Sequence, residues 1–222
     1  MVCQSCGRYL ITAKEYMVGP NFGKPRTLPA IFNDTTMIQP TEEQILFIKR
    51  LVTTSLDQLI AKDSDIFNIG IEMPQQISPD ARLLNRELHE TTINHRLAFY
   101  LEQNIQETDL EFYNVDIEYN RYYSIQKRLN TVEGQLSVRP DILIHTRIND
   151  HVEQQHYLAV EAKKAEITPH DINKIEGFIS DPNYLYLFGL TISYCINETN
   201  VLANLYYFNG TTIVKEEINR PK

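Results

Sequence analysis

The stretch SVRPDILIHTRINDHVEQQHYLAVEAKK, Ser137–Lys164, decides the fold because it holds two short apolar runs, ILI and YLAV, around a polar loop. Short apolar runs bounded by turn residues are typical of strands, and the loop RINDHVEQ has about the length of a hairpin connection. Charged residues interrupt both runs, at Asp141, Glu161 and Lys163. Strands built for burial rarely carry charge, so these three side chains need an explanation of their own.

Side-chain alternation tells which way the three charged residues point. In a strand, every second residue shares a face, so Asp141 lies with Leu143, and Glu161 lies with Lys163. Glu161 and Lys163 are about 7 Å apart by the strand rise. If the two strands pair across the loop, we expect Asp141 to join them at one end of the sheet.

A helix upstream carries a further acid. The segment NRELHETTINHRLAFYLEQNI, residues 85–105, has apolar residues at helical spacing, which predicts an amphipathic helix. Its apolar ridge consists of Ile93, Leu97, Leu101 and Ile105. Glu90 stands in line with this ridge, one turn before Ile93. We therefore expect its carboxylate to face the sheet and to approach Asp141 and Glu161.

Carboxylates gathered at a partly buried position repel one another and are costly to desolvate. A divalent cation removes that cost, and Mg²⁺ takes one or two carboxylates together with waters and a substrate phosphate. A neighbouring lysine adds a positive charge for a phosphate oxygen. Two acids and a lysine around a metal ion therefore suit phosphodiester hydrolysis. Each residue alone also fits a turn acid or a solvated strand-end pair, so the argument depends on the set.

The remaining chain predicts the fold class and the domain organisation. Thr41 followed by Gln44 predicts a capped helix at about 41–62, and Thr168, Pro169 and Asp171 predict another helix start, followed by further strands. From residue 83 the predicted order is helix, three strands, helix and strands, which is an α/β layout with a mixed sheet flanked by helices. We expect residues 1–80 to form an N-terminal extension with one amphipathic helix, and residues 81–222 to form the main domain.

The motifs RPDILIH and VEAKK, with HETTINHRLAFYLE upstream, resemble the PD-(D/E)XK nuclease superfamily. The resemblance covers about residues 83–195 and leaves the first 80 residues unexplained. Pro140-Asp141 matches the PD, Glu161-Ala162-Lys163 matches the (D/E)XK, and Glu90 matches the acid of the first helix. It implies a restriction-endonuclease-like core of the order α-β-β-β-α-β.

The same resemblance implies a Mg²⁺- or Mn²⁺-dependent nuclease that cuts DNA, in defence against foreign DNA or in DNA processing. Asp141, Glu161, Glu90 and the main-chain carbonyl of Ala162 would hold the metal ion, and Lys163 would position the attacking water. Some members of the superfamily have lost activity and only bind. The alternative is therefore an inactive nucleic-acid-binding or protein-interaction module on the same fold.

Two further groups of residues are candidates for binding. A basic segment interleaved with Tyr122 and Tyr123 could follow a phosphate backbone, or could be a solvated strand edge, and it contains Arg121, Lys127, Arg128 and Arg139. Lys174, one turn into the last helix, could reach a neighbouring phosphate or be a plain surface lysine. Cys3 and Cys6 form half of a zinc site or remain free thiols, because a structural zinc needs four ligands.

Composition limits the remaining classes. With 42% hydrophobic and 23% charged residues, the chain can bury a real core as an ordinary globular protein. The net charge of -8 argues against binding to DNA mainly through an overall basic surface. The start MVCQSCGRYL has no basic region followed by an apolar one, and no apolar run reaches the length of a membrane span. We expect a cytoplasmic protein with DNA as its partner, and a homodimer contact or a partner protein on residues 1–80.

Overall fold

A seven-stranded mixed sheet forms the centre of the computed structural model, which describes residues 37–66, 89–122, 125–131, 134–147, 154–195 and 199–222. In spatial order the strands are β1 (Asn114–Ile117), β6 (Ile142–His145), β7 (His156–Lys163), β8 (Phe188–Ser193), β9 (Asn200–Phe208) and β10 (Ile213–Glu217), and β11 (Arg220–Pro221) also pairs with β9. β7 and β8 run parallel, and the other neighbouring strands run antiparallel. The predicted α/β class with a mixed sheet is confirmed.

The helices of the described residues are α2 (Glu42–Lys62), α4 (Glu90–Ile105), α5 (Pro169–Ser180) and the short 3₁₀ helix η1 (Ser64–Ile66). Two of them, α2 and α5, begin where local capping chemistry predicts. Reciprocal capping boxes close the starts of α2 and α5, between Thr41 and Gln44 and between Thr168 and Asp171. The predicted helix at 85–105 is observed from Glu90 onward, and residues 85–88 lie outside the described ranges. No helix in the described part of the chain is long and apolar enough to cross a membrane.

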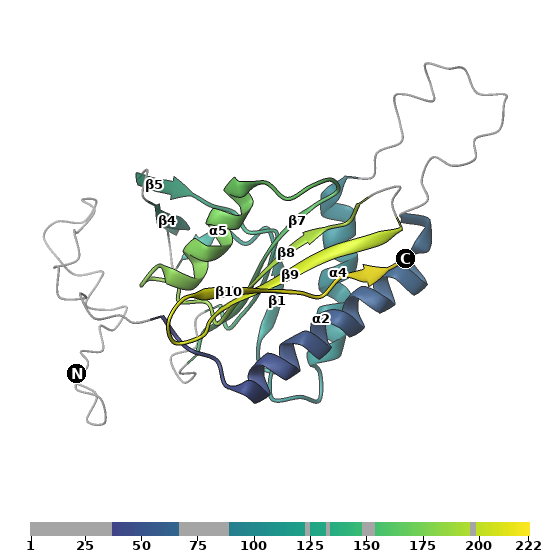
Figure 1. Cartoon of the computed structure of the whole chain (residues 1–222), viewed down its shortest axis with the longest axis horizontal. Coiled ribbons are helices and arrows are strands. Elements are labelled where there is room, and N and C mark those ends of the chain that lie inside the picture. Colours follow the sequence, from purple (N-terminus) through teal and green to yellow (C-terminus); the bar gives the residue numbers. More distant parts are fainter. Residues whose placement is uncertain (1–36, 67–88, 123–124, 132–133, 148–153, 196–198) are drawn as a thin grey trace, which may run out of the picture. The chain divides into compact units, whose positions relative to one another are not determined.

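The two faces of the sheet bury different sets of side chains. One face of β6 and β7 packs Ile142, Ile144 and Val160 into a cluster with the apolar sides of α2 and α4. The opposite face packs Leu143 and Ala159 against the buried residues of α5. Figure 1 shows α2 and α5 on opposite sides of the sheet. The sheet is therefore covered by helices on both faces, as the alternation in its strands predicts.

Helix α2 belongs to the main core. Its buried residues Ile48, Leu56 and Leu59 lie in the same hydrophobic cluster as α4 and the sheet. The helix itself was predicted correctly. It was assigned to an N-terminal extension of residues 1–80, whereas in the structure it packs in the core of the main unit. Residues Thr36–Lys222 form one compact unit that includes α2. The expected partner surface on residues 1–80 otherwise falls on residues 1–36 and 67–80, which lie outside the described ranges.

Two small hairpins lie in the chain between β1 and β6. They are β2 (Arg121–Tyr122) with β3 (Ile125–Gln126), and β4 (Arg128–Thr131) with β5 (Gly134–Ser137). Both pair only within themselves among the described strands, outside the seven-stranded sheet. When they are set aside, the order of elements through the centre of the molecule is α4-β1-β6-β7-α5-β8.

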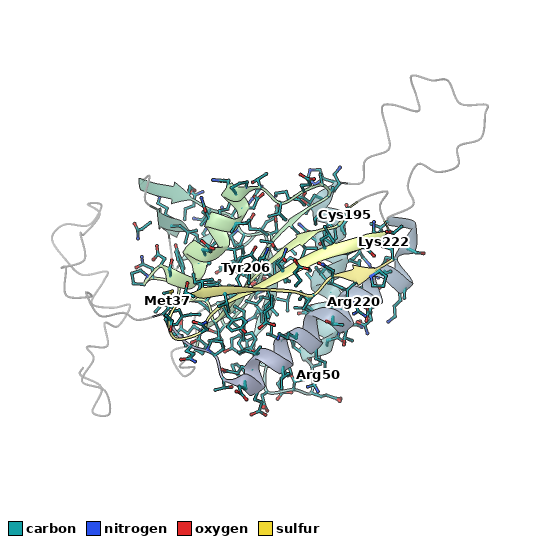
Figure 2. All side chains as sticks on the ribbon, viewed as in Figure 1. Met37, Arg50, Cys195, Tyr206, Arg220 and Lys222 are labelled. Carbon is teal, nitrogen blue, oxygen red and sulfur yellow. The ribbon has the colours of Figure 1, made fainter. Side chains whose placement is uncertain are left out.

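Arg220 and Lys222 link the last strand, β11, and the residue after it to α2 and to the segment after β8. Arg220 makes two hydrogen bonds to the Asp57 carboxylate of α2, at 2.7 and 2.8 Å. Lys222 Nζ donates to the main-chain oxygen of Cys195, directly after β8, at 2.7 Å. Figure 2 shows Arg220, Lys222 and Cys195 at the same end of the sheet, and it shows side chains filling the layers on both sides.

Candidate active site

Asp141 and Glu161 lie side by side at one end of the β6–β7 pair. Ile142 is paired with Val160, so the antiparallel register sets Asp141 opposite Glu161. The main-chain N–H of Asp141 donates to Val160 O at 3.1 Å, so Asp141 is hydrogen-bonded to β7 directly before β6 begins. The Asp141 carboxylate turns across to β7, where it accepts from the N–H of Ala162 at 2.8 Å. The predicted proximity of these two acids is confirmed.

Lys163, the last residue of β7, lies between two carboxylates. Its Nζ is 3.4 Å from Glu90 Oε1 and 3.9 Å from Asp141 Oδ2. Partial burial works against its positive charge, but the negative charges of Asp141 and Glu90 outweigh burial and raise its pKa. Lys163 is therefore a positive charge at neutral pH and connects Glu90 of α4 with Asp141, the residue directly before β6.

Glu90 reaches this cluster from the first position of α4. Its second carboxylate oxygen accepts from the main-chain N–H of Lys164 at 3.1 Å. The apolar ridge of α4 packs on the face of the sheet opposite to the Glu161 side chain, because Val160 and Ala162 point to that face. Glu90 therefore joins the cluster at the end of β7, beyond the last strand residue. The predicted approach to Asp141 is confirmed, but no contact joins Glu90 to Glu161 among the described interactions.

A hydrogen bond farther along α4 fixes this position. Asn94, one turn after Glu90, accepts a hydrogen bond from the hydroxyl of Tyr194 at 2.7 Å, and both side chains are buried. Tyr194 directly follows β8, and its N–H donates to Lys163 O at 2.8 Å. Burial, with smaller effects from Asp141 and Glu90, holds the pKa of Tyr194 well above its usual value. The tyrosine therefore stays a neutral donor that ties the start of α4 to the end of β7.

Glu161 is the most deeply buried acid of the cluster, at 1% exposure. Its Oε2 accepts from Lys174 Nζ of α5 at 2.7 Å. Its Oε1 is buried and has no hydrogen-bond partner among the described residues. Burial, followed by the negative charge of Asp141, raises the pKa of Glu161 to about 7 against the opposing effect of Lys174. A buried carboxylate oxygen without a donor is open to a cation.

Lys174 has a different position from the one that its sequence context predicts. Besides the contact with Glu161, its Nζ lies 3.8 Å from Asp171 Oδ1, one turn earlier on α5. Its side chain is 17% exposed. Lys174 is therefore neither a plain surface lysine nor a free phosphate contact, since it neutralises the buried acid of the cluster.

The basic segment divides into one buried and three exposed residues. Lys127 is 1% exposed and has its Nζ over the rings of Tyr119 and Tyr184, at 5.5 and 5.3 Å from their centroids. The structure does not support Lys127 as a phosphate contact, because this side chain is directed into the interior. Three arginines of the segment are exposed, namely Arg121, Arg128 and Arg139. Arg139 forms an ion pair with Glu118.

A second polar cluster, around Asp116 of β1, was not predicted. Asp116 accepts two hydrogen bonds from Arg147, at 2.7 and 2.5 Å, and its carboxylate lies 2.9 Å from His145 Nε2. Burial opposes ionisation, but Arg147 and His145 together hold the pKa of Asp116 far below its usual value. The sequence signal that could have indicated this cluster is the polar His145, which shares a strand face with the apolar Leu143. The cluster lies at the opposite end of β6 from Asp141. Its acid, Asp116, is paired with Arg147 and His145 of the same cluster.

The residues around Glu161 fit a hard divalent cation in their chemistry. Asp141 and Glu161 are neighbouring carboxylates, and one oxygen of Glu161 lacks a donor, which suits an ion that takes one or two carboxylates and several waters. Among the described residues, no group of three or more histidine, cysteine, aspartate and glutamate side chains could hold a metal ion by itself. The third acid, Glu90, is separated from Asp141 by Lys163. Cys3 and Cys6 lie outside the described ranges, so the zinc hypothesis stays a prediction.

Comparison of the chain with protein-family models, with curated proteins and with solved structures gives no significant match.

Proposed function

We propose that this chain is a metal-dependent nuclease that hydrolyses phosphodiester bonds in DNA. The observation that carries the proposal is that Lys163 lies between Glu90 and Asp141 at the end of the β6–β7 pair, where Asp141 is the cross-strand neighbour of Glu161. The element order α4-β1-β6-β7-α5-β8 agrees with the restriction-endonuclease-like core that the PD-(D/E)XK resemblance implies. Acids that converge with a lysine at a sheet end suit phosphoryl chemistry better than they suit fold stability, because buried acids are costly to desolvate.

Asp141 and Glu161, with the main-chain carbonyl of Ala162, would hold Mg²⁺ or Mn²⁺. When it is bound, the cation supplies a Lewis acid for the phosphate and lowers the pKa of the attacking water. The hydrogen bond from Ala162 N–H holds the Asp141 carboxylate against the strand. This contact orients the acid before any cation arrives.

Lys163 acts as a charged donor in this proposal. Because the neighbouring acids raise its pKa, its ammonium stays protonated at neutral pH and is unsuited to act as a base. It can hold the attacking water and stabilise the negative charge that develops on the phosphate. Glu90 accepts from Lys163 and from the N–H of Lys164, so its contribution here is to orient the ammonium.

The exposed arginines support nucleic acid as the partner. Arg121, Arg128 and Arg139 lie on or beside the two small hairpins and can contact phosphates, while the chain as a whole carries a net charge of -8. An acidic protein with local positive charge is expected to bind DNA weakly without its metal and with a shallow salt dependence.

The test is a nuclease assay on plasmid, linear duplex, single-stranded DNA and RNA, with Mg²⁺, Mn²⁺ or EDTA. We expect cleavage of DNA that requires the cation and that is lost in Asp141→Asn. Asp109→Asn is the matched control, because Asp109 is an exposed acid outside the cluster. Mn²⁺ binding without cleavage of any of the four substrates would contradict the nuclease and favour the inactive binding module.

A further inference from the structure

The contact between Lys174 and Glu161 joins the last helix to the cluster and has a consequence for cation binding. Glu161 is 1% exposed, and one of its carboxylate oxygens accepts a hydrogen bond from the Lys174 ammonium. An ammonium within hydrogen-bond distance of a carboxylate competes with any other cation for the same charge. A divalent ion that binds Glu161 therefore has to share this carboxylate with Lys174 or displace the lysine.

Asp171 gives Lys174 a second partner on its own helix. Its Oδ1 lies 3.8 Å from Lys174 Nζ, at the i, i+3 spacing that brings side chains together on one helix face. Its other oxygen is held by Thr168, whose N–H and hydroxyl donate to it at 3.0 and 2.7 Å. Burial opposes the ionisation of Asp171, but these hydrogen bonds and the neighbouring lysines outweigh it and lower the pKa of the carboxyl. The second partner is therefore a fixed anion.

The charges around Glu161 favour movement of Lys174 away from Glu161 when a divalent ion binds there. Without a cation, Asp141, Glu161 and Glu90 face the ammonium groups of Lys163 and Lys174. A divalent ion added to this set would bring three positive groups into one small space. If Lys174 moves to Asp171, the ion replaces one positive charge at Glu161 and the lysine stays paired.

We infer that Lys174 is a built-in competitor for the metal ion, which holds Glu161 in the metal-free protein and moves to Asp171 when the ion binds. This inference rests on the proposed function, because it assigns a regulating lysine to the proposed metal site. Lys174 is a positioning residue in this scheme, and it sets the cation concentration at which the site fills.

The first test is calorimetric titration of Mn²⁺ into the wild type and into Lys174→Gln at pH 8.5. Glutamine keeps a hydrogen-bond donor for Glu161 and removes the competing charge. An opposite charge this close changes the affinity of a carboxyl for a proton by about one to three powers of ten, and the same field opposes Mn²⁺. We expect Lys174→Gln to bind Mn²⁺ about tenfold more tightly, while Lys215→Gln, an exposed lysine of β10, has the affinity of the wild type.

The second test removes the alternative partner. Asp171→Asn keeps an oxygen that can accept from Thr168, so the start of α5 remains capped, but it no longer attracts the displaced ammonium. We expect this variant to bind Mn²⁺ a few-fold more weakly than Glu176→Gln, a control that also removes one acid from α5. This variant retains the ion pair between Lys174 and Glu161, so it keeps the inference testable if Lys174→Gln does not fold.

The outcomes separate the inference from the proposed function. Tighter binding by Lys174→Gln together with weaker binding by Asp171→Asn supports the competitor. Unchanged or weaker binding by Lys174→Gln overturns it and leaves a lysine that only braces the site, while the nuclease proposal stands. Absence of Mn²⁺ binding in the wild type and in both variants overturns the metal site itself.

Discussion

Lys163 lies between Glu90 at the start of α4 and Asp141 directly before β6. This position predicts that single substitutions in the cluster affect metal binding and cleavage differently. Asp141→Ala removes a proposed metal ligand and a partner of Lys163, so metal binding and cleavage should fall together. Lys163→Ala leaves Asp141 and Glu161 in place. We expect this variant to bind Mn²⁺ at least as well as the wild type and to cleave DNA about a hundredfold more slowly, the usual loss for one preorganised electrostatic group.

Calorimetry with Mn²⁺ and single-turnover cleavage measure the two effects separately. DNA binding in Ca²⁺ should survive in Lys163→Ala, which shows that the fold and the substrate surface are intact. Cleavage by Lys163→Ala at the wild-type rate would mean that this lysine makes a strand-end ion pair and has no part in the chemistry.

Lys127 is a single residue whose surroundings work against its charge. Burial lowers the pKa of Lys127 to about 8, although Asp116 acts in the opposite direction, and two tyrosine rings lie against its ammonium. Because the folded pKa lies below the unfolded value of about 10.4, unfolding takes up a proton between these values. The stability of the wild type therefore rises as the pH increases from about 8 to about 10.4, and below that window Lys127 costs free energy.

We expect Lys127→Met to raise the free energy of unfolding at pH 7 by about 1–3 kcal/mol, because methionine fills the same space without a charge. Urea unfolding at pH 7 and pH 10 measures the gain, which should shrink at the higher pH. Lys215→Met, at an exposed position of β10, should change neither value. A gain that is the same at both pH values would show that packing, and not the charge, is responsible.

At the scale of elements, the distance between α5 and the sheet is set by a glycine. A Cβ built on Gly189 of β8 would overlap the side chain of Ile175, whereas a Cβ on Gly177 of α5 would lie 3.1 Å from the end of the Leu129 side chain. The first contact is with a β-branched residue in a fully buried helix face, which cannot yield easily. The second contact is longer and meets the end of the Leu129 side chain, which has to shift by only a few tenths of an ångström.

This difference predicts opposite results for two matched substitutions. Gly189→Ala should lower the free energy of unfolding by about 1–3 kcal/mol through overpacking. Gly177→Ala should leave stability unchanged or raise it by up to about 1 kcal/mol, since alanine is the better helix former. Thermal unfolding of both variants is the measurement, and Ile175→Ala should partly rescue Gly189→Ala. Equal melting temperatures for the two glycine variants would contradict the close approach of α5.

At the scale of the whole molecule, α2 and the sheet share one hydrophobic cluster and should unfold together. Leu56→Ala empties a fully buried position of α2, so we expect a loss of about 2–5 kcal/mol in a single unfolding transition. Leu46→Ala changes the same helix at a residue that is 69% exposed and should be nearly neutral. Calorimetry and hydrogen exchange follow the two variants. Loss of α2 alone, with the sheet still protected at its wild-type level, would show that the helix is a separate extension.

The positions of Asp141, Glu161 and Lys163 could be predicted because they depend on residues that are close in the chain. Alternation within a strand and the antiparallel register across one loop are enough to set these three side chains together. The capped starts of α2 and α5 are equally local, since each capping box joins residues three apart. The apolar ridge of α4 follows from the 3.6-residue period in the same way.

The sequence by itself therefore determined the main helices, the order of the main strands and the acids and lysine of the candidate site, but not the two small hairpins between β1 and β6. The tertiary structure decided which charged side chain each of these acids and lysines contacts. Glu90 and Lys163 are 73 residues apart in the chain, and the burial of Lys127 depends on Tyr184, which follows α5. No local pattern states that Lys174 neutralises Glu161 or that α2 enters the core. Hydrogen-bond caps and side-chain periods act within a few residues, whereas desolvation and ion pairing depend on which distant elements pack together.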